Sequence, residues 1–329
     1  MKPIKTAVVG VGALGKHHLR WMSQLHNAEL VGIFDTDRSR ADALAKEYNT
    51  RTFQSLDQLA EKAEAVSIAV TTSAHYAVAS ELIRRGIHCL IEKPVTSTYE
   101  QARELIALGT QHGVKVAVGQ IERFNPAVQA LAPYAIRPSF IEAHRLAAFD
   151  PRGTDVAVVL DLMIHDIDLV LHFVKAKLID IQASAVAIVS VAADIANARL
   201  TFANGTVANL TASRISLRPM RKFRIFQPSG YYSLDLAVKQ ADIYKLATDT
   251  TEAGMRVPLG KSGKDILYVK KSDTGKDMLG AEIESFLNAI INDSSVAVSL
   301  EEATEALRVA LEVERIGKSS IELMMAHTG

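Results

Sequence analysis

Cysteine is almost absent from this chain: Cys89 is the single one among 329 residues. One cysteine cannot form an intramolecular disulfide, which argues against the disulfide-rich secreted class and favours a reducing compartment. Cys89 lies in a short apolar segment, where a cysteine usually serves as a small buried residue. We therefore expect a cytoplasmic protein.

An excess of one charge and long apolar runs are also missing. The 37 Lys and Arg residues balance the 37 Asp and Glu residues, so the charge does not indicate a nucleic-acid partner. A basic cluster from Arg218 to Arg224 fits a solvated strand face better than a phosphate clamp. No apolar run reaches membrane-spanning length, and the first strand begins too early for a signal peptide. We therefore expect no nucleic-acid partner and no membrane segment.

The most informative stretch is the glycine motif Gly10-Val11-Gly12-Ala13-Leu14-Gly15. An apolar strand precedes it, a helical pattern follows it, and the next apolar strand ends in Asp35. A strand, a glycine loop, a helix, a second strand and an acid make up the dinucleotide-binding fingerprint. Gly10 permits a tight turn, and Gly12 lets the backbone approach a pyrophosphate. Gly15 lets the helix pack on the strand, and the helix N-terminus offers N–H groups to phosphate.

Asp35 sets the expected cofactor. Its carboxylate is placed to accept hydrogen bonds from ribose hydroxyls and would repel a 2′-phosphate, which favours NAD over NADP. Arg38 and Arg40 follow closely and would accept a phosphate if the loop turned, so NADP remains the alternative.

Strand and helix patterns alternate up to about residue 121, which predicts an α/β Rossmann domain, a doubly wound parallel sheet, over residues 1–121. Prolines then interrupt the pattern, and an apolar helix is expected over residues 156–174. Alternating segments joined by hairpins follow, and Asn204-Gly205 predicts a two-residue type I′ turn. Residues 122–329 are therefore expected to form an α+β domain with an antiparallel sheet. The alternating segments are 181–189, 197–202, 206–215, 222–226 and 232–236.

The expected helix over 156–174 is apolar except for Asp161, His165, Asp168 and His172, which share one face at helical spacing. Ionisable groups on a buried helix either face a polar cleft or pair with one another. A divalent metal is a third possibility, but helical metal sites draw ligands from several helices, and no second set is found. We expect no metal.

A second candidate group is Glu92-Lys93-Pro94, at the end of a parallel strand, where such sheets bind ligands. A lysine there can stabilise a developing alkoxide. The alternative is an ordinary surface lysine before a turn proline.

Taken together, the glycine motif, Glu92-Lys93-Pro94 and Asp161-x-x-x-His165-Asp166 resemble the glucose–fructose oxidoreductase/inositol dehydrogenase family (Gfo/Idh/MocA). The resemblance implies that Lys93, Asp161 and His165 are catalytic and that the Lys93–Pro94 bond is cis. It also implies an open-faced sheet in the second half that binds substrate and forms a homodimer or homotetramer. The cofactor-binding residues expected from the fingerprint and the resemblance are Gly10, Gly12, Ala13, Leu14, Gly15, Asp35, Arg38, Thr71, His75, Glu92 and Lys93.

One departure from the family pattern is Thr71, where the family often has a proline before the loop that ends in His75. We expect the loop to remain usable by the cofactor. The segments 118–126 and 151–155 resemble the nucleotide-sugar branch of the family. Arg123 and Arg152 are therefore expected to bind phosphates and Asn125 the sugar, alongside Lys93, Asp161 and His165. Surface ion pairs are the alternative role for the two arginines.

The activity expected from this resemblance is NAD-dependent transfer of hydride from a sugar ring hydroxyl to nicotinamide. The expected substrate is a nucleotide sugar such as UDP-N-acetylglucosamine, oxidised at its 3-hydroxyl. His165 would act as general base, since histidine ordinarily titrates near neutrality. The alternatives are a dehydrogenase of a free sugar or inositol, and a non-catalytic family member that senses dinucleotide or sugar.

Overall fold

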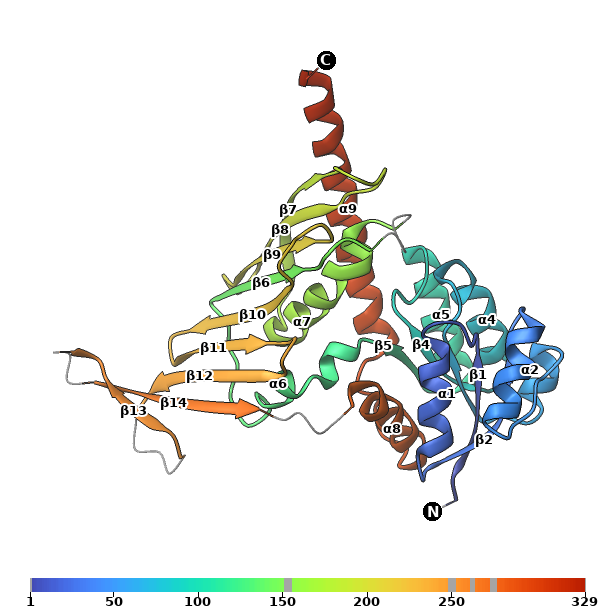
Figure 1. Cartoon of the computed structure of the whole chain (residues 1–329). Coiled ribbons are helices and arrows are strands. Elements are labelled where there is room, and N and C mark those ends of the chain that lie inside the picture. Colours follow the sequence, from blue (N-terminus) through green and yellow to red (C-terminus); the bar gives the residue numbers. More distant parts are fainter. Residues whose placement is uncertain (1, 151–155, 248–252, 261–263, 273–276, 329) are drawn as a thin grey trace. The chain divides into compact units, whose positions relative to one another are not determined.

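The computed structural model describes residues 2–150, 156–247, 253–260, 264–272 and 277–328, with side chains as far as Glu322. The chain forms two compact units (Figure 1). The first contains residues 1–124 and 276–307, and the second contains 125–275 and 308–329. The first boundary lies close to the expected one at 121, but residues 276–307 return to the first unit rather than staying in the second.

The first unit contains a five-stranded parallel sheet in the order β2-β1-β3-β4-β5. Two of its strands, residues 65–68 and 116–119, are buried at every position, as a sheet covered on both faces requires. The doubly wound sheet expected from the sequence is therefore confirmed. The strands are β1 (Ile4–Val9), β2 (Ala28–Phe34), β3 (Ala65–Ile68), β4 (His88–Glu92) and β5 (Val116–Gly119).

Helices connect these strands, and one of them comes from the far end of the sequence. Helix α8 (Met278–Ile291) packs on α1 (Gly15–Gln24). A Cβ on Gly280 would lie 2.9 Å from the Trp21 ring, so the glycine permits this close approach. This packing explains why residues 276–307 belong to the first unit. The other helices of the first unit are α2 (Arg38–Glu47), α3 (Leu56–Ala60), α4 (Thr72–Arg84), α5 (Tyr99–His112) and the 3₁₀ turn η1 (Ile121–Phe124).

The second unit contains a nine-stranded sheet in the order β13-β14-β12-β11-β10-β6-β9-β8-β7. Neighbouring strands are antiparallel except for the parallel pair β6–β9, so the sheet is mixed. Strand β6 lies in a segment that the sequence analysis had treated as a connection. The strands are β6 (Phe140–Leu146), β7 (Leu178–Val186), β8 (Ile195–Phe202), β9 (Val207–Ser213), β10 (Met220–Gln227), β11 (Gly230–Asp235), β12 (Gln240–Leu246), β13 (Met255–Pro258) and β14 (Asp265–Ser272).

The expected hairpin between β8 and β9 is present, but its turn type was predicted wrongly. A type I′ turn needs positive φ at both central residues, whereas only Gly205 has one (+85°). Asn204 uses its side chain instead, accepting a hydrogen bond from the Thr206 N–H at 3.1 Å. Strand β8 ends at Phe202 and β9 begins at Val207, so the connection is longer than two residues.

The predicted helix over 156–174 is two elements, the π-helix η2 (Val159–Met163) and the α-helix α7 (Ile164–Val174). The Ile164 N–H bonds to the Val159 carbonyl, five residues earlier. The assumption of one continuous α-helix was therefore wrong for the turn that contains Asp161. Helix α7 packs on β6 and β9, and α6 (Pro126–Gln129) packs on β11 and β12.

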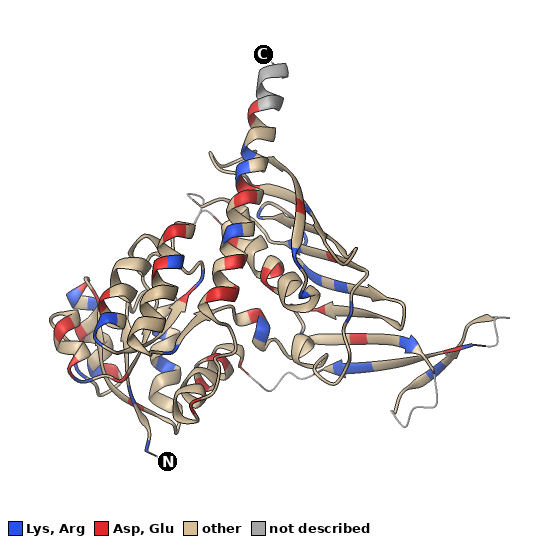
Figure 2. Cartoon of the chain, turned by 180° about the vertical axis from the view of Figure 1, so that it is seen from behind, with Lys and Arg blue, Asp and Glu red and all other residues tan. Residues whose placement is uncertain are grey.

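Helix α9 (Leu300–Thr328) is the last helix in the sequence order and begins with a capping box. The Ser299 hydroxyl accepts from the Glu302 N–H, and the Glu302 carboxylate accepts from the Ser299 N–H, both at 3.2 Å. Acidic and basic residues are interspersed along α9 (Figure 2). Within the described part of the chain, no helix combines the length and apolarity needed to cross a membrane.

Candidate active site

The glycine loop between β1 and α1 fits a pyrophosphate. Gly10 has φ +83°, and a Cβ there would lie 2.6 Å from the Ala69 carbonyl oxygen. A Cβ on Gly15 would lie 1.8 Å from the Gly10 carbonyl oxygen, so both positions require glycine. A Cβ on Gly12 would meet nothing within 4 Å. The first turn of α1 has neither an acidic side chain nor a side-chain cap, which leaves backbone N–H groups for an anion.

Asp35 follows β2 and lies beside this loop, as the fingerprint predicts. Its buried carboxylate accepts hydrogen bonds from the Val11 N–H at 2.7 Å and the Asp37 N–H at 2.8 Å. The Arg40 guanidinium donates to it at 2.9 Å. Burial acts to raise the pKa of Asp35, but these hydrogen bonds outweigh it and hold the pKa below its ordinary value. Asp35 is therefore an ionised acceptor at neutral pH.

Arg38 lies away from Asp35. Its guanidinium donates to the backbone carbonyls of Phe53 at 2.7 Å and Gln54 at 2.8 Å. Of these two arginines, the structure pairs Arg40 with Asp35.

Glu92, the last residue of β4, is part of a buried polar chain. Its carboxylate lies 2.9 Å from His18 Nε2, and His18 Nδ1 lies 2.7 Å from the Ser67 hydroxyl. The same carboxylate accepts from the Lys93 N–H at 3.2 Å. A Cβ on Gly119 of β5 would lie 2.9 Å from a Glu92 carboxylate oxygen, so the glycine leaves room for this group. This hydrogen-bonded network of Glu92, His18 and Ser67 fixes the backbone at Lys93.

His75, in α4, fixes the other side of this segment. The Lys93–Pro94 bond is cis, as the resemblance implied. His75 Nδ1 lies 2.9 Å from the Pro94 carbonyl oxygen, and Nε2 lies 3.2 Å from the Val70 carbonyl oxygen. Burial lowers the pKa of His75 and favours the neutral ring. His75 therefore links the loops that follow β3 and β4.

Three further predicted positions are Thr71, Arg123 and Arg152. Thr71 is exposed and directly precedes α4. Arg123 is buried, and its guanidinium lies 3.6 Å from Glu302. The contact is an ion pair within the first unit and Arg123 is buried, whereas the alternative expected a pair at the surface. Arg152 lies outside the described residues.

Asn125 belongs to the second unit and caps α6. Its side-chain oxygen accepts from the Ala127 N–H at 3.0 Å, and its amide donates to the Leu236 carbonyl at 2.9 Å. An asparagine directly before Pro126 is a helix-start signal that the sequence offered.

Asp161 lies in the π-helix η2, and His165 lies one turn later in α7; both are partly exposed. The next residue, Asp166, forms a buried ion pair with Arg145 of β6. Its two carboxylate oxygens accept from the guanidinium at 2.9 and 2.8 Å. This two-point contact fixes the turn of α7 that carries His165 to the sheet. Asp168 is buried and His172 partly exposed, so the stripe is not uniformly accessible.

Two of these anchoring residues, His18 and Arg145, were missed by the sequence analysis. His18 is fully buried. Its position relative to Gly15, Leu19 and Met22 follows the buried face of α1, and this spacing was available as a signal. Arg145 lies in the strand that was not predicted. Among the described residues, no group of three His, Cys, Asp or Glu side chains is placed to hold a metal ion.

Comparison with known proteins decides the family. The model of an oxidoreductase family with an NAD-binding Rossmann fold matches residues 4–120, and the GFO/IDH/MocA C-terminal domain matches residues 99–233. The chain belongs to the Gfo/Idh/MocA family. It is 40% identical to UDP-N-acetylglucosamine 3-dehydrogenase of Acidithiobacillus ferrooxidans over 311 residues, which cover 94% of this chain and 96% of that enzyme. It is 30% identical to inositol 2-dehydrogenase of Rubrobacter xylanophilus over 175 residues, half of each chain.

Solved structures agree with this assignment. The structure of the Acidithiobacillus ferrooxidans enzyme matches with a TM-score of 0.88 and 37% identity, covering 97% of this chain and 99% of that one. Levoglucosan dehydrogenase in complex with NADH and levoglucosan matches with a TM-score of 0.83, covering 97% and 98% of the two chains. At 16% identity the second match shows the shared fold alone.

Proposed function

We propose that this protein is an NAD-dependent dehydrogenase that oxidises the 3-hydroxyl of UDP-N-acetylglucosamine or a closely related nucleotide sugar. The observation that carries the proposal is the 40% identity to a UDP-N-acetylglucosamine 3-dehydrogenase over nearly the whole chain. The glycine loop and the ionised Asp35 support NAD as the cofactor, because a carboxylate there accepts from ribose hydroxyls and repels a 2′-phosphate.

Three side chains carry the proposed chemistry. His165 takes the proton from the sugar hydroxyl, and Asp161 orients both groups. The Lys93 ammonium stabilises the alkoxide that develops on the sugar oxygen. Bound NAD supplies the hydride acceptor. Glu92 and His75 contribute by fixing the backbone on either side of Lys93, and Arg145 contributes by fixing α7 through Asp166.

The direct test is reduction of NAD by the purified full-length protein with UDP-N-acetylglucosamine, free N-acetylglucosamine, glucose and inositol as substrates. Lys93→Ala and His165→Ala should each lower kcat by about 10²- to 10⁴-fold. His165→Ala should leave the Kd for NAD unchanged. Lys46→Ala and His26→Ala, at exposed positions of the first unit, are the matched controls. Near-normal turnover in either active-site variant would show that the residue is not catalytic.

The substrate panel also separates the alternatives. Ready oxidation of inositol or free sugar without response to UDP-sugars would replace the nucleotide-sugar assignment and keep the dehydrogenase. The partial match to inositol 2-dehydrogenase makes inositol the first comparison. Binding of NAD or UDP-sugar without any turnover would favour a sensing role.

We also propose that the open face of the second unit's sheet joins copies of this chain into a homodimer or homotetramer. A row of partly buried aromatic rings crosses five neighbouring strands there, with centroids 4.7–5.6 Å apart. Such a row is a large apolar surface of the kind enriched at protein interfaces. Light scattering should give a multimer mass that Tyr244→Glu reduces, and a monomeric parent protein would refute the proposal. The row is Phe140, Phe226, Tyr231, Tyr244 and Tyr268.

A further inference from the structure

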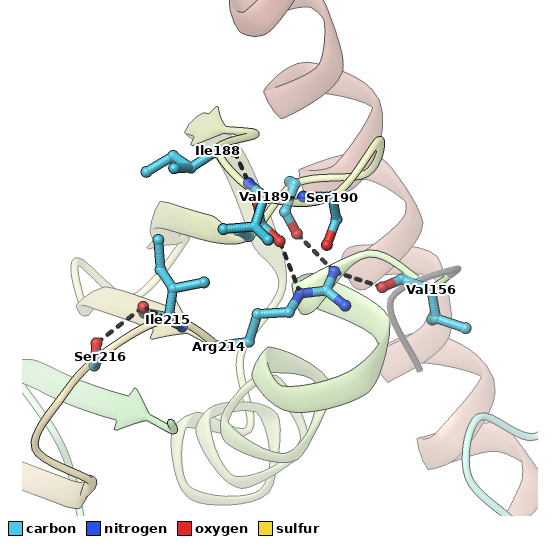
Figure 3. Close-up of polar contacts among 10 residues, drawn as sticks. Val156, Ile188, Val189, Ser190, Arg214, Ile215 and Ser216 are labelled. Atoms are coloured by element: carbon cyan, nitrogen blue, oxygen red, sulfur yellow. Dashed lines mark hydrogen bonds and ion pairs between the residues drawn. The ribbon is translucent and has the colours of Figure 1, made fainter. Parts of the chain in front are cut away.

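A buried ion pair of Arg214 lies near Val156, just before the π-helix η2 that carries Asp161 (Figure 3). Arg214 directly follows β9, and Asp194 directly precedes β8; Arg214 Nε lies 3.4 Å from an Asp194 carboxylate oxygen. The two side chains are 7% and 0% exposed. Neither residue was singled out from the sequence, and the proposed chemistry does not use them.

Asp194 fixes the connection between β7 and β8. One of its carboxylate oxygens accepts from three consecutive backbone N–H groups, those of Ile188, Val189 and Ser190, at 2.8, 2.7 and 3.0 Å. Burial alone would raise the pKa of Asp194, but these donors outweigh it and keep the pKa far below its ordinary value. The carboxylate therefore stays ionised and presents a fixed negative charge to Arg214.

Arg214 links the β7–β8 connection to the backbone just before η2. Its Nη2 donates to the Val156 carbonyl at 2.5 Å (Figure 3). The same Nη2 donates to the Ala193 carbonyl at 2.8 Å. The Ala193 carbonyl also accepts from the Val158 N–H at 3.1 Å. Val156 is thus bound by Arg214, and Val158 is bound by Ala193 of the β7–β8 connection.

Asp161 is hydrogen-bonded to this same segment, because its N–H donates to the Ala157 carbonyl at 3.1 Å. No side-chain cap is present at the start of η2, although the first N–H groups of a helix lack intrahelical partners. π-helical turns are rare, and they recur at functional sites. The Arg214 contacts hold the residues just before η2 in place, which a side-chain cap would otherwise do.

A buried ion pair is weak evidence for stability, since apolar residues often replace one without loss. Its better-supported role is to specify one arrangement. We propose that Arg214 and Asp194 are positioning residues that hold the first turn of η2, and with it Asp161 and His165, in the arrangement needed for turnover. This inference rests on the catalytic roles assigned to Asp161 and His165 above.

The test compares Arg214→Met, which keeps the side-chain length without the donors, with Arg214→Lys, which keeps the charge. Arg214→Met should lower kcat by about a hundredfold, the effect of a misplacement near 1 Å, with the KM for NAD unchanged. Arg214→Lys should recover part of the loss, because an ammonium can still donate to a carbonyl. Arg224→Met is the control, since Arg224 pairs with Glu142 at 3.1 Å but is 40% exposed.

Hydrogen exchange supplies a readout that does not depend on activity. In Arg214→Met, amides of residues 156–165 should exchange faster than in the parent protein, while those of 166–174 stay the same. Unchanged exchange at 156–165, or kcat within twofold of the parent, would overturn the inference. Faster exchange throughout the second unit with a matching loss of Tm would also overturn it, because the role would then be general stability. If the parent protein oxidises no sugar, the proposed function fails, and exchange alone still decides the placement of η2.

Discussion

Gly119→Ala tests whether the hydrogen-bonded network of Glu92, His18 and Ser67 is as rigid as its contacts indicate. The added Cβ would lie 2.9, 3.0 and 3.1 Å from Oε1, Cδ and Oε2 of Glu92, closer than side-chain carbons pack. The end of a glutamate side chain can ordinarily move away at little cost. Here the carboxylate is buried and bound by His18 and the Lys93 N–H. Movement would break these contacts, so the substitution should be destabilising.

The magnitude follows from the cost of overpacking a buried site, about 1–3 kcal/mol. For a unit of about 150 residues, each kcal/mol lowers Tm by about 2–4 °C. We therefore expect Gly119→Ala to lower Tm by roughly 2–12 °C. Turnover should fall as well, since the displaced Glu92 no longer holds the Lys93 backbone.

Gly109→Ala is a control of opposite sign. Gly109 lies inside α5, and a Cβ there would meet its neighbours at 3.6–4.0 Å, which is ordinary contact. Alanine is favoured over glycine in a helix by about 0.8–1.0 kcal/mol, so this variant should raise Tm. Both variants add one methyl group to a buried glycine of the first unit.

The assay is thermal unfolding followed by circular dichroism, with kcat measured on the same samples. A double-mutant cycle then isolates the cause: in a Glu92→Ala background the added cost of Gly119→Ala should largely disappear. An unchanged Tm and kcat in Gly119→Ala would show that Glu92 moves freely and would refute the rigid chain. An equal cost in both backgrounds would place the strain elsewhere.

Two further predictions concern the cofactor acid and the buried histidine. Asp35→Ser should lower kcat/KM for NAD about tenfold or more, since hydrogen bonds to charged groups contribute about 1.5–3 kcal/mol. Asp42→Ser is the control. A parent protein that prefers NADP would contradict the assignment of NAD. The lowered pKa of His75 means that its stability contribution is complete above about pH 6.5 and decreases as pH falls toward the folded-state pKa. The Tm advantage of the parent over His75→Gln should therefore shrink between neutral and mildly acidic pH, and a constant difference would refute it.

The first unit was largely predictable because its signals are local. The glycine loop, the acid after the second strand and the alternation of strands and helices each lie within short stretches of sequence. The structure places Gly10, Gly12, Gly15 and Asp35 together for that reason. His18 was missed because its partners are remote: Ser67 is 49 residues away and Glu92 is 74. A buried histidine becomes intelligible only when the sheet brings those partners to it.

The second unit was less predictable because its order depends on pairing between distant segments. Strand β6 pairs in parallel with β9 and antiparallel with β10, and neither contact has a local signal. The prolines nearby suggested a connection, although the segment 140–146 alternates in burial as a strand should. Missing this strand also hid Arg145, and with it the reason why Asp166 can be buried.

The π-helical turn explains why helical spacing alone was insufficient at Asp161. Positions i and i+4 share a face only where every residue turns the chain by about 100°. The bond from Ile164 to Val159 spans five residues, so η2 holds one residue more per turn than α7 does. The angular relation between Asp161 and His165 therefore depends on whether that wider turn persists. Arg214 and Ala193 bind Val156 and Val158, just before this turn. The geometry of the candidate catalytic pair is therefore determined partly by residues far away in the sequence.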